Sequence, residues 1–201
     1  MAGGLGSAVH LAQVLVAERL KRGSVAVDAT AGKGNDTVFL ARRVGRSGKV
    51  YAFDIQAEAL VRTGEFLKRQ NLAGSVELVC AGHERVAEYV RERADAVMYN
   101  LGYLPGGDPS VVTRPETTIA SLTAALGLLR SGGRISLVSY PGHPGGREEY
   151  EAVEKFAAAL DSLYYRVIRV NFINRAVHAP VLIMIEKAGV FGESEEAAQN
   201  P

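Results

Sequence analysis

Residues 24–37 read SVAVDATAGKGNDT, and the order of residue types in this stretch predicts a strand, a tight turn and the start of a helix. The run 24–29 is mostly apolar, as expected of a strand buried on both faces of a parallel sheet. Gly32 and Gly34 permit a positive φ and let a ligand approach the main chain, and Asn35 or Asp36 can cap the helix that follows. The stretch therefore predicts one unit of an α/β sheet with a ligand-binding turn.

The same alternation of apolar periods continues along the chain. Besides the helix after Gly34, at 35–44, helices are expected at 7–22, 57–71, 84–92 and 147–160, with another after 114 that carries Leu122 and Leu126 on one face. Further strands are expected at 49–54, 75–80, 95–100, 134–140, 164–173 and 179–187. The last two are joined by the short connection NRAVH, which suits an antiparallel pair because parallel strands need about a dozen connecting residues. The predicted fold is a Rossmann-like, mostly parallel, doubly wound α/β sheet with an antiparallel C-terminal strand, the order of class I methyltransferases.

Length and amino-acid composition predict a single-domain protein without disulfides, metal sites or membrane spans. The chain has 201 residues, of which 47% are apolar and 22% charged, which predicts one domain over 1–188 followed by a flexible acidic tail at 189–201. The single cysteine, Cys80, excludes a disulfide framework and a Cys-rich zinc site, and we expect it to be buried on a strand. No metal site is predicted. No run approaches the roughly 18 apolar residues that span a bilayer, so a cytoplasmic protein is expected.

Charge is distributed unevenly. The formal net charge is only +1, but residues 1–50 hold eight Lys or Arg against three Asp or Glu. This excess favours a phosphate-binding surface, with the alternative that the cations are solvated helix ends and turns. The candidate RNA contacts in this region are Lys21, Arg22, Arg42, Arg43 and Arg46.

The glycine turn and the strand after it predict a nucleoside cofactor. The turn is neither a P-loop nor G-x-G-x-x-G, because Lys33 precedes a glycine and Thr37 stands where the third glycine would be. Asp54 ends the next strand about 20 residues on, where a carboxylate can accept both ribose hydroxyls. NAD and S-adenosylmethionine share that ribose. Asp28 and Asp36 decide between them, since they would repel a pyrophosphate but attract the positive charges of S-adenosylmethionine.

Three further strand ends carry candidate residues. Gly82 and His83 follow the third strand, near the expected adenine. The stretch NLGYLPGGD at 100–108 resembles the Asn-Pro-Pro-Tyr loop of amino-group methyltransferases, with Leu-Gly in place of Pro-Pro. The stretch YPGHPGG at 140–146 places His143 over the same crevice. The alternative is that these prolines and glycines form ordinary turns.

Taken together, DATAGKGNDT, FDIQ, NLGYLPGGD and YPGHPGG resemble a bacterial family formerly labelled rRNA methylases. That family is now associated with the tRNA methyltransferases that act on 5-aminomethyl-2-thiouridine at the wobble position. The resemblance covers residues 1 to about 188, and the NLGYLPGGD and HPGG blocks are specific to it.

The resemblance implies an S-adenosylmethionine-dependent N-methyltransferase whose partner is the tRNA anticodon stem-loop, gripped by one chain or by a homodimer. A methyltransferase acting on rRNA or on a small molecule, and a non-catalytic nucleotide-binding module, stay open as alternatives. The implied catalytic residues are Asn100, Tyr103, Asp108 and His143, and Tyr140 joins the RNA contacts. The candidate cofactor contacts are Asp28, Thr30, Gly32, Gly34, Asn35, Asp36, Thr37, Asp54, Gln56, Gly82, His83 and Asn100.

Overall fold

The structure is a computed structural model that describes residues 6–102, 106, 112–176 and 178–189 of the chain. The helices are α1 (Ala8–Ala17), α2 (Asn35–Val44), α3 (Ala57–Arg69), α4 (Val86–Tyr89), α5 (Pro115–Leu128) and α6 (Gly146–Ala158), with 3₁₀ turns η1 (Ala73–Ser75) and η2 (His83–Arg85). The strands are β1 (Val25–Asp28), β2 (Lys49–Asp54), β3 (Val76–Cys80), β4 (Ala94–Asn100), β5 (Leu129–Ser139), β6 (Tyr165–Val170) and β7 (Val181–Lys187).

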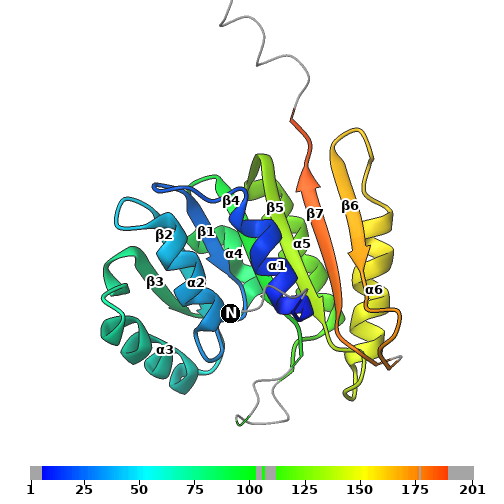
Figure 1. Cartoon of the computed structure of the whole chain (residues 1–201), viewed down its shortest axis with the longest axis horizontal. Coiled ribbons are helices and arrows are strands. Elements are labelled where there is room, and N and C mark those ends of the chain that lie inside the picture. Colours follow the sequence, from blue (N-terminus) through cyan, green and yellow to red (C-terminus); the bar gives the residue numbers. More distant parts are fainter. Residues whose placement is uncertain (1–5, 103–105, 107–111, 177, 190–201) are drawn as a thin grey trace, which may run out of the picture.

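These strands form one sheet in the order β3-β2-β1-β4-β5-β7-β6 (Figure 1). The pairs from β3 to β5 are parallel, and β7 runs antiparallel to both β5 and β6. The predicted Rossmann-like methyltransferase fold is therefore confirmed. The strand order reverses between β1 and β4, and sheets of this kind bind ligands at the carboxyl ends of the strands at such a reversal.

Helices cover both faces of the sheet, and each face has its own apolar core. Val16 of α1 and Leu40 of α2 pack into one core, and Leu122 of α5 and Val153 of α6 pack into the other. All four residues of β1 are buried, as the apolar run predicts for a central parallel strand. None of the helices in the described ranges is long and apolar enough to cross a membrane.

Two helices are shorter than predicted. The helix expected at 84–92 is η2 followed by α4, which ends at Tyr89 because Val90 takes an extended conformation, with φ −84° and ψ 113°, and enters the core. The helix expected at 7–22 ends at Ala17. The next residues form i→i+3 hydrogen bonds that tighten the last turn and bury Leu20.

Two strand predictions were also wrong in detail. The strand β5 begins at Leu129 and not after the Ser-Gly-Gly run, because Gly132 adopts a positive φ of 73° and the pairing with β4 shifts register there. Cys80 is exposed, not buried, because β3 is the edge strand. The expected acidic tail falls almost entirely on residues 190–201, outside the described part of the chain.

Candidate active site

A cavity of about 740 Å³ opens at the carboxyl ends of β1, β2, β3 and β4. This is the edge of the sheet at which the strand order predicts a ligand. Its walls combine apolar side chains, such as Phe53 and Ile55, with a larger number of polar ones. Polar residues in the wall include Thr30, Asn35, Asp36, Asp54, Gln56, His83, Asn100, Thr113, Arg114 and Tyr140.

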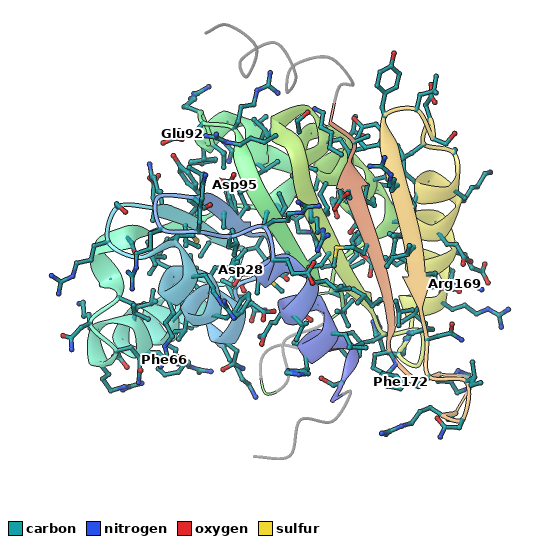
Figure 2. The ribbon with its side chains drawn as sticks, turned by 45° about the horizontal axis from the view of Figure 1, so that its top comes forward. Asp28, Phe66, Glu92, Asp95, Arg169 and Phe172 are labelled. Carbon is teal, nitrogen blue, oxygen red and sulfur yellow. The ribbon has the colours of Figure 1, made fainter. Side chains whose placement is uncertain are left out.

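The turn after β1 is held from behind by Asp28. Its carboxylate accepts hydrogen bonds from the Thr30 N–H at 3.2 Å and from the Thr37 hydroxyl at 2.6 Å. Figure 2 labels Asp28. Gly34 is the N-cap of α2 with φ +78°, and a Cβ there would lie 2.9 Å from the Thr63 side chain. A glycine is therefore required at this position both for its backbone conformation and for the close approach of α3.

The end of β2 presents Asp54 to the cavity. One carboxylate oxygen accepts the Gly32 N–H at 2.9 Å and the other accepts the Gln56 N–H at 2.8 Å. A carboxylate has about four acceptor sites, so both oxygens keep capacity for a ligand hydroxyl. These two backbone bonds tie the glycine turn to the end of β2 and fix the orientation of the carboxylate.

A second carboxylate, Asp36 in the first turn of α2, holds Asn100 at the end of β4. Asp36 accepts a hydrogen bond from Asn100 Nδ2 at one oxygen and from Gln13 Nε2 at 2.6 Å at the other. The Asn100 main-chain N–H donates to the Thr30 hydroxyl at 2.7 Å. Asn100 Oδ1 is buried and has no hydrogen-bond partner within the described residues. The amide is thus fixed in orientation, with a free acceptor.

The site is electronegative. Burial, followed by the neighbouring Asp36 carboxylate, raises the pKa of Asp28. Burial likewise raises the pKa of Asp36, against the opposing effect of its hydrogen bonds from Gln13 and Asn100. No cationic side chain in the described ranges forms an ion pair with either carboxylate. A positively charged ligand would complement this pair.

The raised pKa of Asp28 has a consequence for stability. Because its folded-state pKa lies above the unfolded value of 3.8, the contribution of this group is fully present below pH 3.8 and is lost as the pH rises through the folded-state pKa. We expect the free energy of unfolding of Asp28→Asn to fall less than that of wild type between about pH 5 and 9, by on the order of 2 kcal/mol. Urea unfolding across that range measures this, and parallel curves for the two proteins would contradict it.

The end of β3 places His83 in the cavity wall. His83 is 8% exposed, and burial lowers its pKa, so a neutral ring is favoured. Its carbonyl accepts the Ser121 hydroxyl at 2.8 Å, and its ring meets Tyr99 edge-on at 5.8 Å between centroids. Nδ1 is buried without a hydrogen-bond partner in the described part of the chain, so it is available to a ligand.

A network of hydrogen bonds around Glu149 fixes the residues that follow Asn100. Glu149 of α6, which is 2% exposed, accepts the Thr113 and Thr118 hydroxyls, each at 2.7 Å. The Thr113 hydroxyl in turn accepts the Gly102 N–H at 2.7 Å, and the Thr113 N–H donates to the Gly102 carbonyl at 2.9 Å. Gly102 and Thr113 therefore pair with each other, and Glu149 of α6 fixes the Thr113 side chain.

The cavity gathers most of the predicted cofactor contacts, but not all of them. Asp28 and Thr37 are buried behind the turn, and Gly34 serves the backbone, so these three act as supports. His143 lies against Gly102, where a Cβ would come within 2.9 Å of its Nε2, and its Nδ1 contacts the Pro144 carbonyl at 2.9 Å. Tyr103 and Asp108 lie outside the described residues.

The basic residues predicted near the N-terminus lie away from the cavity. Arg42 and Arg43 are in the last turn of α2, whose first turn carries Asp36, so about 9–11 Å of helix separates them from that carboxylate. Lys21, Arg22 and Arg46 flank the amino ends of β1 and β2.

Sequence reasoning missed Gln13, Glu149, Thr113 and, as cavity residues, Lys33 and Arg114. Gln13 gave no signal in the sequence, because the position of α1 relative to the site depends on packing. Glu149 gave none either, since only the tertiary fold brings α6 to Thr113 and Thr118.

The cavity fits S-adenosylmethionine. The Asp36 carboxylate in the cavity wall suits a cation and opposes a pyrophosphate, whereas Asp28 is buried behind the turn. Asp54 keeps acceptor capacity for a ligand hydroxyl, and Asn100 Oδ1 is a buried acceptor without a hydrogen-bond partner in the described residues. The volume of about 740 Å³ lies within the range of small-molecule sites.

Comparison with known proteins agrees with this reading. The family described as "Putative rRNA methylase" matches residues 50–186. The chloroplastic tRNA (mnm(5)s(2)U34)-methyltransferase of Arabidopsis thaliana is 40% identical over 192 residues, which is 90% of this chain and 69% of that protein.

Two solved structures share the fold and much of the sequence. A protein from Clostridium thermocellum, described as a "putative rRNA-methylase", has a TM-score of 0.90 and 43% identity, and the match covers 92% of this chain and all of that one. SMU.1697c from Streptococcus mutans, described as "a putative methyltransferase" and solved in complex with SAH, has a TM-score of 0.83 and 37% identity, and the match covers 93% of this chain and 99% of that one. The chain therefore belongs to the rRNA methylase family and is a class I, S-adenosylmethionine-dependent methyltransferase.

Proposed function

We propose that the chain methylates the primary amine of 5-aminomethyl-2-thiouridine at the wobble position of tRNA, giving 5-methylaminomethyl-2-thiouridine. The observation that carries this proposal is Asn100 Oδ1, a buried acceptor held in the cavity by the bond from its own Nδ2 to Asp36. The name of the A. thaliana relative supports the choice of tRNA.

Residues at three strand ends would hold the cofactor. Asp54 would accept the ribose hydroxyls, and His83 and Gly82 would face the adenine. The Asp36 carboxylate would attract the positively charged end of the molecule, with Thr30, Gly32, Asn35 and Gln56 completing the walls. When bound, S-adenosylmethionine supplies a methyl group attached to a cationic sulfur. The neutral thioether is a good leaving group and needs no acid.

Asn100 orients the nucleophile. An ammonium has no lone pair, so the amine must be neutral when its nitrogen forms the new bond to carbon. An N–H of that amine donates to Asn100 Oδ1 and another donates to the Leu101 carbonyl, which directs the lone pair at the methyl carbon. The proton left on nitrogen then passes to Asp108 or His143, and Tyr103 stacks on the base. These last three roles rest on the resemblance to the family motif.

Mass spectrometry of tRNA nucleosides from a strain lacking this protein tests the proposal. We expect 5-methylaminomethyl-2-thiouridine to disappear and its 5-aminomethyl precursor to accumulate. The purified protein should restore the methyl group on that tRNA in vitro. Loss of a methylated rRNA nucleoside instead, or methylation of a free amine with no dependence on RNA, would overturn the choice of substrate.

Glu149 is proposed as a positioning residue for the same pocket. In Glu149→Gln the amide nitrogen cannot accept a hydrogen bond from a hydroxyl, so one of the two threonine bonds is lost and the Gly102–Thr113 pair is held less firmly. We expect kcat to fall about tenfold, corresponding to the roughly 1–2 kcal/mol of one hydrogen bond to a charged group. The affinity for S-adenosylmethionine should not change.

The control for this prediction separates positioning from general loss of structure. Thr113→Val removes the other end of the bond, so the effects of Glu149→Gln and Thr113→Val on kcat should be less than additive in the double variant. Fully additive effects, or a loss confined to cofactor affinity, would show that Glu149 does not act through Thr113.

A further inference from the structure

The connection between β6 and β7, residues 171–180, lies at the same edge of the sheet as the cavity (Figure 1). It packs against the loop that follows β5, because a Cβ on Gly142 would lie 3.1 Å from His178 Cβ. That loop carries Tyr140, which lines the cavity, and His143. In the strand order, β5 and then β7 separate this connection from β4, so it begins about 10–14 Å from the strand that carries Asn100.

The surface of this connection combines apolar, aromatic and cationic groups. Ile173 at its tip is 94% exposed. The Arg175 guanidinium lies over the Phe172 ring at 5.7 Å from the centroid (Figure 2 labels Phe172), and His178 is exposed beside them. An exposed apolar tip beside a cation and an aromatic ring is the pattern that binds unstacked bases and the phosphates between them.

Charge divides the edge of the cavity into two halves. The half at β2 and β3 carries Asp54 and the exposed Glu84, and the exposed Lys33 lies beside it in the turn after β1. The half beyond β4 carries Arg114 in the cavity wall and Arg175 in the β6–β7 connection, and neither forms an ion pair with a described residue. An anionic substrate would therefore approach over the β4–β6 half.

The other cations of this half are already neutralised by carboxylates. Within the described ranges, Arg147 pairs with Glu151 and Arg169 pairs with Glu154. Arg114 and Arg175 are therefore the arginines available to an outside anion on the side where the nucleophile pocket lies.

We propose that the β6–β7 connection and Arg114 bind the single-stranded RNA that flanks the target nucleotide, with phosphates at Arg114 and Arg175 and a neighbouring base against Phe172 and Ile173. This inference rests on the proposed function. It places the RNA across the β4–β6 half of the edge and not over the basic residues at the end of α2. The spacing from Asn100 means that the connection contacts neighbouring nucleotides and not the methylated one.

The test compares two charge reversals of equal size. Arg114→Glu/Arg175→Glu changes the proposed surface, and Arg43→Glu/Arg46→Glu changes the far end of α2 by the same charge. The affinity of a fluorescein-labelled anticodon stem-loop is measured by anisotropy at several salt concentrations, and Arg175→Glu alone is measured beside them. Calorimetry with S-adenosylhomocysteine and thermal unfolding check that the cofactor site and the fold are intact.

We expect Arg175→Glu to weaken stem-loop binding about tenfold and to reduce the slope of log K against log salt by about 0.7, the value for one single-strand phosphate. The Arg43→Glu/Arg46→Glu control should stay within about twofold of wild type, since a solvated face contributes little to binding. Ile173→Ser should weaken binding without changing the slope, because it removes contact with a base and no charge.

Each other outcome has a distinct meaning. If Arg114→Glu/Arg175→Glu left affinity and slope unchanged and Arg43→Glu/Arg46→Glu lost affinity, the RNA would bind at the far end of α2 and this inference would be wrong. The proposed function would still stand as long as the wild-type protein methylates tRNA. A change from dimer to monomer in Ile173→Ser with unchanged RNA affinity would make the connection a contact between copies. Failure of wild type to methylate precursor tRNA, with cofactor binding intact, would overturn the proposed function itself.

Discussion

Asn100→Ala is expected to lower the single-turnover rate of tRNA methylation about 10²-fold or more, the cost of a misaligned nucleophile. The loss should persist across about pH 6.5 to 9.5, because an amine can lose its proton to water before it binds, whereas only the protein can aim its lone pair. The substituted alanine also leaves Asp36 with Gln13 as its remaining side-chain donor among the described residues. Rates are measured with saturating S-adenosylmethionine on tRNA that carries the 5-aminomethyl precursor.

Gln13→Ala is the matched control for this variant. It removes the other donor to Asp36 but leaves Asn100 Oδ1 in place, so it reports how much of the effect comes from an unsatisfied carboxylate. We expect it to lower the rate less than about tenfold, in line with one hydrogen bond. If Asn100→Ala kept a near wild-type rate, or if both variants lost the same activity, Asn100 would not be the residue that aligns the amine.

The order of the elements could be predicted from sequence because the apolar periods decide it. The run 24–29 is buried on both faces, and the short link between the last two strands requires an antiparallel pair. Lengths were harder to predict. The helix at 84–92 is short because Val90 leaves it to pack into the core. The space that Val90 fills is formed by other elements, so the sequence of 84–92 alone does not predict it.

The site residues that stand at strand ends could be predicted from the sequence. Asp54, His83 and Asn100 each end or follow a strand, and the parallel sheet brings them to one edge. Residues that support them were not predictable in the same way, because Gln13 and Glu149 reach the site from helices whose position depends on packing. The location of the basic residues likewise required the length and direction of α2, which carries Arg42 away from the edge where its first turn holds Asp36.

Asp54→Ala is expected to weaken the binding of S-adenosylmethionine by about 10²- to 10⁴-fold, because two hydrogen bonds to a charged acceptor are lost at once. The carboxylate is already oriented by the Gly32 and Gln56 N–H groups, so little entropy is spent in presenting it to a ligand. The same two bonds mean that the substitution also disturbs the backbone. A moderate fall in the thermal unfolding temperature is expected in addition to the loss of affinity.

A change in the ligand separates these two effects. Calorimetry with S-adenosylhomocysteine and with its 2′,3′-dideoxy analogue, on wild type and on Asp54→Ala, forms a double-mutant cycle between the carboxylate and the ribose hydroxyls. If Asp54 holds the hydroxyls, their removal costs wild type most of its affinity and costs Asp54→Ala almost nothing further. If Asp54 serves only to hold the turn, removal of the hydroxyls lowers the affinity of both proteins by the same factor. Equal losses, at unchanged circular dichroism, would then place the ribose against another wall of the cavity.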